Sequence, residues 1–328
     1  MKAHLPALLA HPRFEVVALA SPSSVAKIAK ERGIAHAFRS CKEMVAACEL
    51  DAVTIAAPPF THRQDVEVAL DAGKQVICEK PFALNVAQAQ EMLETSQRAG
   101  TVCGVAHEFR WVPAQQAVKE LIENRHLQPL RELEITQLST FLRLDGTRER
   151  GWWFERARGG GVAGALLSHV IDMSNWLAGR SPKRTAGFLR TANPRRHDAR
   201  GEFTSDVDDG AFALLDYGDG LVARLCVDAT VAQPSFTLAV HAENRTAVAS
   251  GENIIETTLY SVDAQETAEL QCKPSPYAHL SSVQPNVPYL AELYDNFAAA
   301  IDGKPYSLPS FAEALETQRV LAAIGFSA

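Results

Sequence analysis

The first hundred residues alternate short apolar runs with stretches of helical spacing. Apolar, partly β-branched runs of strand length occur at 14–20, 52–57, 75–78 and 101–106. Stretches with apolar residues every three or four positions occur at 24–32, 63–72 and 85–99. This alternation predicts βαβ units, and therefore a parallel sheet covered on both faces. Strands that are apolar throughout are typical of such doubly buried positions.

From about residue 108 the strand-like runs become longer and follow one another more directly. Strands are predicted at 132–142, 210–217, 221–227, 237–242 and 246–250, and helices at 113–124, 164–177, 288–301 and 310–323. The turn Tyr217-Gly218-Asp219-Gly220 predicts a hairpin, and Ser310 with Glu313 is expected to cap the last helix. We therefore predict an α/β fold: an incomplete Rossmann-type parallel sheet in a domain of residues 1–107, followed by an α+β domain of residues 108–328 with a mostly antiparallel open sheet.

The composition is consistent with two domains that each have a hydrophobic core, and it argues against nucleic acid or a membrane as a partner. The 328 residues are 47% hydrophobic, which is enough for two cores. The net charge of −7 is spread along the chain, which argues against nucleic acid as a partner. The arginine-rich segment 184–200 is expected to be a solvated, mobile loop around Pro194. No apolar run approaches the roughly 20 residues that span a bilayer, and no secretory signal pattern is present, so we expect no membrane partner and a cytoplasmic location.

The six cysteines have no CxxC spacing. Most of them lie in apolar surroundings along the sequence. We therefore expect reduced core residues rather than disulfides or zinc ligands, and no metal site.

Candidate chemistry lies in residues 75–82, where an apolar strand ends in an acid, a base and a proline. A lysine just past the carboxyl end of a buried strand points into the crevice where parallel α/β sheets bind ligands, and its ammonium group can donate to a substrate oxygen. Lys80 is therefore the first catalytic candidate. The alternative interpretation is that Glu79 and Lys80 open a solvated loop and that Pro81 ends the strand.

Four motifs, in their order and spacing, carry a resemblance to a known family. They are Ala-Pro-Pro-Phe-Thr-His at 57–62, Glu-Lys-Pro at 79–81, a glycine triplet at 159–161 leading to Ser-His-Val-Ile-Asp at 168–172, and the tail 309–321. Over nearly its whole length the sequence resembles the glucose-fructose oxidoreductase / inositol dehydrogenase (Gfo/Idh/MocA) family. The resemblance implies an amino-terminal Rossmann domain that binds NAD or NADP, and an open antiparallel sheet that forms a substrate wall and often a subunit interface.

The resemblance also implies roles for individual residues. Hydride transfer to or from a secondary alcohol needs a group that manages the hydroxyl proton and a donor that stabilises charge on oxygen; Lys80 and His169 would share these roles. Taken alone, His169 is better explained as a core histidine in an apolar helix. Asp172, one turn later, would orient His169 or cap an interface. The expected cofactor contacts on the Rossmann side are Pro58, Pro59, His62, Glu79 and Lys80, and the Lys80–Pro81 peptide is expected to be cis.

The candidates for substrate binding are Arg110 and Trp153, together with His169 and Asp172. Arg110 could bind a substrate carboxylate or hydroxyl groups, and an interdomain ion pair is the alternative. Trp153, with Trp152 beside it, could form a sugar-stacking wall, or the two rings could bury the domain interface.

Two positions depart from the family pattern. Many relatives have an aspartate four residues before the histidine, where this chain has Ala165, so that a carboxylate partner for the substrate hydroxyl is missing. The family often has an asparagine where this chain has Glu108. Both differences put a direct transfer of a polyol dehydrogenase mechanism in doubt.

The start of the sequence departs further. A Rossmann domain needs a first strand and a glycine-rich turn whose amides approach the pyrophosphate. Residues 1–9 already have the pattern of the first helix and 14–20 that of the second strand, so about 15 residues of such a unit are missing. A misassigned start, a truncation and a loss of cofactor binding are the competing explanations. The first is favoured because the other motifs are intact.

The choice between NAD and NADP depends on the residues that follow the run 14–20. An acidic residue there would bind the adenosine ribose, but the sequence continues Ser21-Pro22-Ser23-Ser24. Ser21 and Ser23, with Lys27, could bind a 2′-phosphate, which slightly favours NADP. Alternatively, these serines cap the following helix, with Ser24 as its N-cap.

Three functional hypotheses remain from the sequence. The first is an NAD(P)-dependent oxidoreductase acting on a secondary alcohol or ketone of a sugar, inositol or related small molecule. The second is a catalytically impaired relative that binds a sugar-like ligand or a partner protein without redox turnover. The third is a hydro-lyase or glycosidase that retains NAD for internal redox cycling. In each case the open antiparallel sheet needs a second layer to cover it. We therefore expect a homodimer or homotetramer formed through the carboxyl-terminal sheet.

Overall fold

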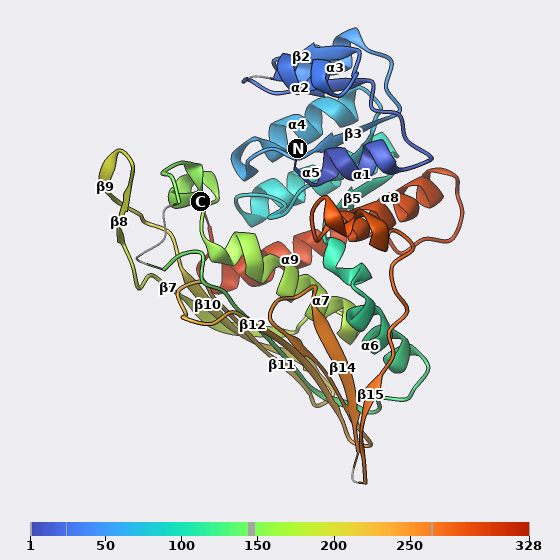
Figure 1. Ribbon diagram of the computed structural model, residues 1–328, viewed down its shortest axis with the longest axis vertical. Helices are drawn as coiled ribbons and strands as arrows, with labels where there is room; N and C mark the ends of the chain where they lie inside the picture. The colour runs from blue at the N-terminus through green and yellow to red at the C-terminus, as the bar shows by residue number, and fades with distance from the viewer. Residues whose placement is uncertain (1, 24, 144–147, 264, 328) are drawn as a thin grey trace. The chain divides into compact units, whose positions relative to one another are not determined.

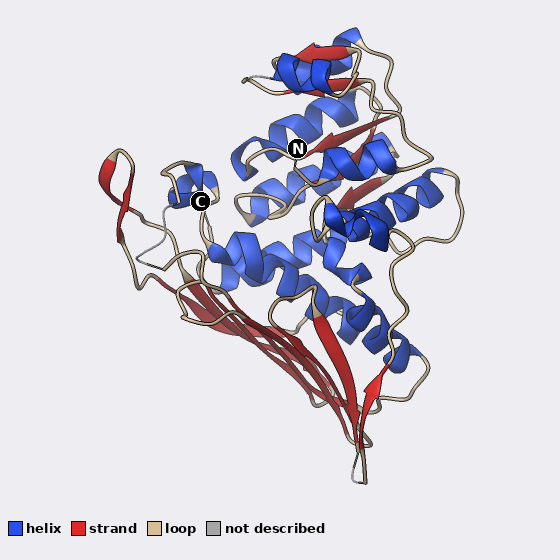
Figure 2. Cartoon of the chain, viewed as in Figure 1, coloured by secondary structure: helices blue, strands red, loops and turns tan. Residues whose placement is uncertain are grey.

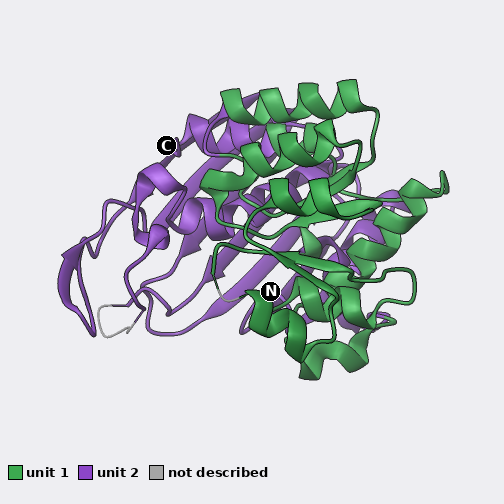
Figure 3. Ribbon diagram, turned by 90° about the horizontal axis from the view of Figure 1, so that it is seen from above, with its two compact units in different colours: residues 1–83, 87–108, 276–315 green, residues 84–86, 109–275, 316–328 purple. Residues whose placement is uncertain are grey.

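The computed structural model describes residues 2–23, 25–143, 148–263 and 265–327. The chain divides into two compact units (Figure 3). Unit 1 comprises residues 1–83, 87–108 and 276–315, and unit 2 comprises residues 84–86, 109–275 and 316–328. A single boundary at residue 107 therefore does not describe the units, because segment 276–315 belongs with the amino-terminal part.

Unit 1 contains two parallel sheets. β1 (Ala18–Ala20) pairs with β2 (His36–Phe38), and β4 (Gln75–Cys78) lies between β3 (Ala52–Ile55) and β5 (Cys103–Val105). The helices that alternate with these strands are α1 (His4–Ala10), α2 (Val25–Glu31), α3 (Cys41–Ala47), α4 (Pro59–Asp71) and α5 (Val86–Ala99) (Figure 1). The predicted alternation of strand and helix is confirmed.

Three details of unit 1 differ from the prediction. Only the last three residues of the run 14–20 form a strand, and β2 and α3 were not predicted. The proposed N-cap Ser24 lies outside the described residues. The short polar segment around β2, with His36 and Ala37 exposed, lacks the apolar run that identifies a buried strand.

The carboxyl-terminal segment of unit 1 covers α1. It contains a short 3₁₀ helix, η5 (Ala278–Ser282), and the predicted helix α8 (Val287–Ile301), which packs against α1. The ring of Phe14, in the segment after α1, lies 5.5 Å from that of Tyr294 and is stacked 6.1 Å from that of Phe297. These aromatic contacts link the segment after α1 to α8.

Unit 2 is built on one eight-stranded sheet in the order β15-β14-β13-β12-β6-β11-β10-β7. Its long strands lie side by side in Figure 2, in red. Its strands are β6 (Leu130–Leu138), β7 (Arg184–Arg190), β10 (Gly210–Gly218), β11 (Leu221–Asp228), β12 (Ser235–Ala242), β13 (Thr246–Gly251), β14 (Thr257–Val262) and β15 (Thr267–Leu270). Neighbours are antiparallel except β6 and β11, which are parallel. The predicted mostly antiparallel sheet is confirmed, and β7, β14 and β15 are additions to it.

The sheet buries one face and exposes the other. Along β10, Ala211, Ala213 and Leu215 are buried, whereas Leu214 between them is 58% exposed, as the two-residue period of a strand requires. The helices α6 (Pro113–Glu123) and α7 (Ser168–Ala178) cover the buried face (Figure 2). On the opposite face the described residues place no helix (Figure 1).

The prediction of a mobile loop at 184–200 is wrong. The segment forms the edge strand β7 and the first strand of a hairpin, β8 (Arg195–Asp198) with β9 (Gly201–Thr204). Its arginines are paired: Arg190 contacts Asp209 and Asp228, and Arg196 contacts Asp209. Ion pairs with carboxylates elsewhere in the sequence thus hold this segment in place, although its arginine-rich composition suggests a solvated loop.

The last helix, α9 (Phe311–Ala323), begins with the predicted capping box. The Glu313 amide donates to Ser310 Oγ at 3.2 Å, and the Ser310 amide donates to Glu313 Oε2 at 2.9 Å. Just before it, Leu308 lies against β5 so closely that a Cβ at Gly104 would be 2.6 Å from its side chain. Glycine at position 104 therefore allows this segment to pack on the strand.

Candidate active site

The Glu-Lys-Pro motif lies where the sequence places it, directly after β4. Val76, Ile77 and Cys78 are fully buried, and Glu79 and Lys80 follow at the carboxyl end of the strand. The Lys80 amide donates a hydrogen bond to Glu79 Oε2 at 2.9 Å. The Lys80–Pro81 peptide is cis, as predicted.

A chain of hydrogen bonds holds Glu79 from three other elements. His4 Nε2, on α1, lies 2.8 Å from Glu79 Oε1, and His4 Nδ1 lies 2.8 Å from Tyr294 Oη on α8. Tyr294 Oη is also 3.1 Å from Thr54 Oγ1 on β3. His4 and Tyr294 are buried, so these bonds are shielded from water and restrict the position of the Glu79 carboxylate.

The charge of Glu79 is stabilised in this setting. Burial alone would raise the pKa of Glu79, but the hydrogen bond to His4 and the nearby charges of His4 and Lys80 outweigh it and hold the pKa well below its usual range. Glu79 is therefore ionised at neutral pH and offers its negative charge to Lys80.

His62 links the two loops on this side of unit 1. The ring is fully buried, with Nε2 2.9 Å from the Ala57 carbonyl oxygen and Nδ1 3.1 Å from that of Pro81. Burial lowers its pKa, against the opposing effect of these carbonyls. The neutral ring can donate through one nitrogen only, so His62 ties the start of α4 to the loop after Lys80; a direct cofactor contact stays a prediction.

The other residues predicted to bind a cofactor also lie at strand ends of unit 1. Pro58 and Pro59 begin α4 after β3. Ser21 follows β1, and Ser23 beyond it is exposed, with its amide 3.5 Å from Ser21 Oγ. All of these positions lie at the carboxyl ends of parallel strands, where α/β folds bind ligands.

In unit 2 the glycine triplet makes a tightly packed turn. A Cβ at Gly160 would lie 2.4 Å from the Trp153 carbonyl oxygen, and one at Gly161, whose φ is +103°, would lie 2.4 Å from Asp208 Oδ1. Asp208 Oδ2 accepts a hydrogen bond from the Ala163 amide at 2.6 Å. Backbone packing, together with the positive φ, thus accounts for glycine at these two positions.

The predicted helix after this turn begins with a π-helical turn, η4 (Ala163–Leu167), and continues as α7. His169 is buried on α7, and its ring centroid lies 4.5 Å from that of Phe109. Ala165, where the resemblance implies an aspartate, lies within η4. π turns are frequent at functional sites, and this one determines which residues of 163–172 share a helix face.

Arg110 and Asp172 form a buried ion pair within unit 2. Arg110 Nε donates to Asp172 Oδ2 at 2.8 Å and Nη2 donates to Oδ1 at 2.6 Å. The Arg110 Cζ also lies 5.9 Å from the centre of the Trp176 ring. The paired geometry matches a guanidinium to a carboxylate, and it supports Asp172 as a residue that fixes α7 against η1 (Glu108–Trp111).

Trp152 and Trp153 form a short 3₁₀ helix, η2 (Trp152–Phe154), before the glycine turn. Their rings are 6.4 Å apart, and Trp153 packs edge-on against Phe141 at 5.7 Å. The Arg148 guanidinium lies 4.1 Å above the Trp153 ring. Trp153 is only partly buried, so ligand stacking and structural packing both stay possible roles for it.

Sequence analysis did not identify several members of the group around Lys80. His4, Thr54, Tyr294 and Asn286 are ordinary residues in their own segments, and no local pattern marks them. Glu108 could have been found, because it is a carboxylate separated by one residue from the apolar run 101–106, much as Glu79 follows the run 75–78. The neighbouring strands β4 and β5 place both at one sheet edge.

Within the residues that the structure describes, no three His, Cys, Asp or Glu side chains gather in a way that could bind a metal ion. Nor does any helix there have the length and apolar character needed to span a membrane.

Comparison with known families covers most of the chain. Residues 1–107 match the oxidoreductase family with an NAD-binding Rossmann fold, and residues 115–248 match the GFO/IDH/MocA C-terminal domain. An uncharacterized oxidoreductase of Synechocystis is 34% identical over 187 residues, which are 56% of this chain and 50% of that protein. The 1,5-anhydro-D-fructose reductase of Ensifer adhaerens is 30% identical over 216 residues, 64% of this chain and 60% of the reductase. The matches thus span half to somewhat under two thirds of these relatives.

Solved structures show the same fold. Levoglucosan dehydrogenase in complex with NADH and levoglucosan superposes with a TM-score of 0.86 at 23% identity, covering 98% of this chain and 92% of that one. An oxidoreductase domain protein from Kribbella flavida gives a TM-score of 0.85 at 22% identity, with the same coverage. Motifs, fold and both domain matches agree, and the chain belongs to the GFO/IDH/MocA family of oxidoreductases.

Proposed function

We propose that this protein is an NAD(P)-dependent oxidoreductase that transfers a hydride between the nicotinamide and a secondary alcohol or ketone of a sugar, inositol or related hydroxylated molecule. The observation that carries the proposal is Lys80 at the carboxyl end of β4, beside a Glu79 carboxylate that is held by His4. Relatives named as a 1,5-anhydro-D-fructose reductase, a levoglucosan dehydrogenase and an NADP-dependent scyllo-inositol 2-dehydrogenase support the substrate class.

The residues present fit a nicotinamide cofactor in part. Ser21, Pro58 and Lys80 lie at the ends of three parallel strands, the edge at which Rossmann-type sheets bind dinucleotides. These residues would hold the ribose and nicotinamide ends, and a bound cofactor would supply the hydride acceptor or donor.

The chain's own residues would manage charge and protons. Lys80 would donate a hydrogen bond to the substrate oxygen and stabilise negative charge there. The Glu79 carboxylate would place a negative charge close to the Lys80 ammonium group. His169 is the second acid–base candidate, and Arg110, Trp153 and Asp172 are the substrate-side candidates of unit 2.

We favour NADP slightly over NAD. Ser21 and Ser23 follow β1 where a carboxylate would select the free ribose of NAD, and Ser23 is exposed. Relatives include an enzyme named for NADP and structures with NADH. Fluorescence titration with NADPH and NADH tests the choice: tighter binding of NADPH supports it, and tighter binding of NADH contradicts it.

The experiment for the proposed activity is reduction of NAD⁺ and NADP⁺ by a panel of sugars and inositols, measured by absorbance. Lys80→Ala should lower turnover by about two orders of magnitude or more, with unchanged circular dichroism. The matched control is Lys42→Ala, at an exposed position of α3, which should keep turnover. Wild-type turnover by the Lys80 variant would remove this residue from the mechanism.

A second candidate function has one feature in its favour: Ala165 stands where the resemblance to the family implies an aspartate. We therefore keep the alternative of a family member that binds a sugar-like ligand or a partner protein without redox turnover. Calorimetric binding of a sugar, with no cofactor binding and no turnover, would establish it.

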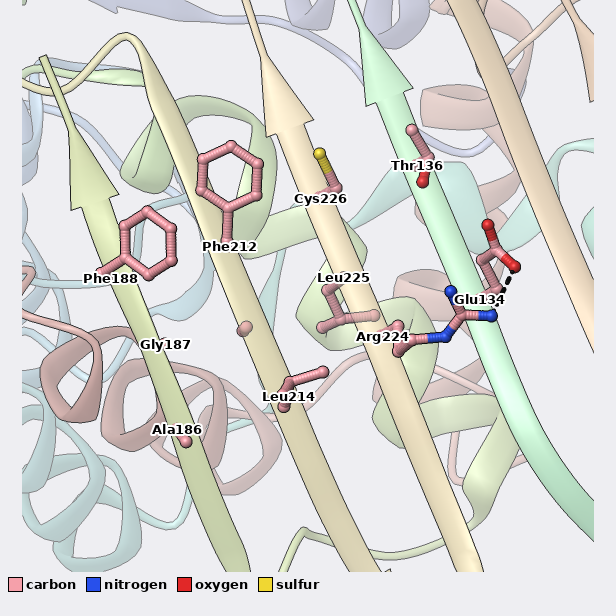
Figure 4. A pocket seen from close by; sticks show the side chains of 11 residues that line it. Glu134, Thr136, Ala186, Gly187, Phe188, Phe212, Leu214, Arg224, Leu225 and Cys226 are labelled. Carbon is pink, nitrogen blue, oxygen red and sulfur yellow. Dashed lines mark hydrogen bonds and ion pairs between the residues drawn. The ribbon is translucent and has the colours of Figure 1, made fainter.

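We also propose that two copies associate through the exposed face of the unit 2 sheet. Phe188 and Leu214 are 59% and 58% exposed there, and Phe188 stacks on Phe212 at 5.0 Å (Figure 4). Arg224 beside them pairs with Glu134 at 2.9 Å. A face that carries an apolar patch and both charges can be self-complementary about a two-fold axis. Sedimentation should give a dimer or tetramer mass that Leu214→Asp reduces to the monomer.

A further inference from the structure

Glu108 stands at the same sheet edge as Lys80. It begins η1, separated by two residues from the end of β5, whereas Glu79 and Lys80 directly follow β4. The two strands are parallel neighbours, with Cys78 opposite Val105. Because the carboxyl ends of parallel strands share one edge of the sheet, Glu108 belongs to the surroundings of Lys80.

The Glu108 carboxyl group is buried and only half satisfied. The residue is 4% exposed. Its Oε1 accepts a hydrogen bond from Asn286 Nδ2 at 3.1 Å. For Oε2, which is buried too, the described residues supply no hydrogen-bond partner. A buried carboxylate oxygen without a donor is costly, so this oxygen is suited either to carry a proton or to meet a hydroxyl group that arrives with a ligand.

Charged groups on each neighbouring element act on Glu108. Burial raises its pKa most, and repulsion by Glu79 adds to this, while Lys80 and the hydrogen bond from Asn286 oppose them; the result is a pKa of about 7. On α8, Tyr294 also responds to Glu108, whose negative charge helps to raise the pKa of Tyr294. Glu108 therefore exists in both protonation states near neutral pH, which suits a group that takes up and returns a proton.

We propose that Glu108 is a further acid–base residue of the Lys80 site and exchanges a proton with a substrate hydroxyl group through Oε2. In the oxidation direction the hydroxyl O–H bond breaks, the proton binds Oε2, and the electron pair remains on the substrate oxygen. That pair forms the carbonyl π bond as hydride leaves the carbon for the oxidised nicotinamide nucleotide. Glu108 returns its proton to water after the product departs. The inference rests on the proposed function.

The first test needs neither cofactor nor turnover. Protein labelled with ¹³C at the glutamate carboxyl carbon is titrated by NMR, as wild type, Glu108→Gln and the exposed control Glu49→Gln. The expected result is one carboxyl signal that titrates near pH 7, is present in the Glu49 variant and is absent in the Glu108 variant. Assignment of Glu108 to a signal with an ordinary glutamate pKa would overturn the inference.

The second test separates this inference from the proposed function. Glu108→Gln should lower kcat about 100-fold or more and remove the ionisation near pH 7 from the pH profile of kcat/KM. Glu108→Asp should restore that ionisation. The control Glu49→Gln should have the rate and pH profile of the wild type. An active wild type matched by Glu108→Gln in rate and pH profile would overturn only the inference. A wild type that oxidises no sugar or inositol with either nucleotide would overturn the proposed function, and this inference with it.

Discussion

Replacing Asp172 by alanine should destabilise unit 2 strongly. The change removes the carboxylate that accepts two hydrogen bonds from Arg110, at 2.8 and 2.6 Å. The side chains of Arg110 and Asp172 are only 4% and 2% exposed. The variant therefore leaves a guanidinium buried without the carboxylate that balances its charge.

The size of the effect follows from this burial. Removing one partner of a buried ion pair costs about 3–5 kcal/mol, whereas exposed pairs contribute about 0–1 kcal/mol. Arg180 and Asp219, 2.7 Å apart and 38% and 74% exposed, provide such an exposed pair in the same unit. Asp219→Asn, which keeps a residue that tolerates the φ of +54° at this position, should thus cost at most about 1 kcal/mol.

Tryptophan fluorescence during urea unfolding is the suitable assay. All four tryptophans of the chain, Trp111, Trp152, Trp153 and Trp176, belong to unit 2, and Trp176 lies against Arg110. The fluorescence transition therefore reports on the unit that contains the ion pair. A double variant, Arg110→Met with Asp172→Leu, should recover most of the lost stability, because it removes both charges and keeps apolar packing.

Two results would refute this reasoning. If Asp172→Ala cost no more than Asp219→Asn, burial would not determine how much an ion pair contributes to stability. If the double variant were as unstable as Asp172→Ala, the loss would come from packing or from another partner of Asp172 instead of an uncompensated charge on Arg110.

Two further predictions concern buried polar groups, one in each unit. Tyr294→Phe removes the hydroxyl that contacts His4 and Thr54 and should lower the free energy of unfolding by about 1–3 kcal/mol for two buried hydrogen bonds, measured by far-ultraviolet circular dichroism in urea. The control Tyr306→Phe, at a residue that is 59% exposed, should change it by less than about 0.5 kcal/mol. Equal effects of the two variants would contradict a stabilising role of the Tyr294 hydroxyl. Burial raises the pKa of Asp208 from 3.8 to about 6, so the folded chain binds the carboxyl proton more tightly than the unfolded chain. Stability should therefore fall as the pH rises from about 4 to about 6. Asp208→Asn should flatten this fall in fluorescence-monitored unfolding, and an unchanged slope would exclude Asp208 as the cause of the pH dependence.

The sequence predicts those parts of the fold that depend on local periodicity. β4 has the predicted bounds of 75–78, and Ser310 with Glu313 forms the expected capping box. Lys80 was placed by the same logic, because an apolar run followed abruptly by charge marks the end of a buried strand. These features need only a few neighbouring residues to be recognised.

Contacts between distant residues could not be predicted in this way. His4 and Tyr294 are 290 positions apart, and neither segment carries a signal of the other. The edge strand β7 was missed because Arg184 and Arg190 suggest solvent, whereas Asp216 and Asp228 pair with them across the sheet. Propensity and composition are overridden where tertiary partners neutralise the charge.

The division of unit 1 along the chain has a consequence for how the protein is made. The ribosome synthesises residues 109–275, the bulk of unit 2, before it reaches α8, the helix that packs against α1. Until then Phe14 lacks both aromatic rings that cover it and His4 lacks the Tyr294 hydroxyl. A nascent chain normally folds its amino-terminal domain first. Here α1 is covered by α8, which is made only after residues 109–275, so the growing chain must keep apolar surface of unit 1 exposed until α8 emerges.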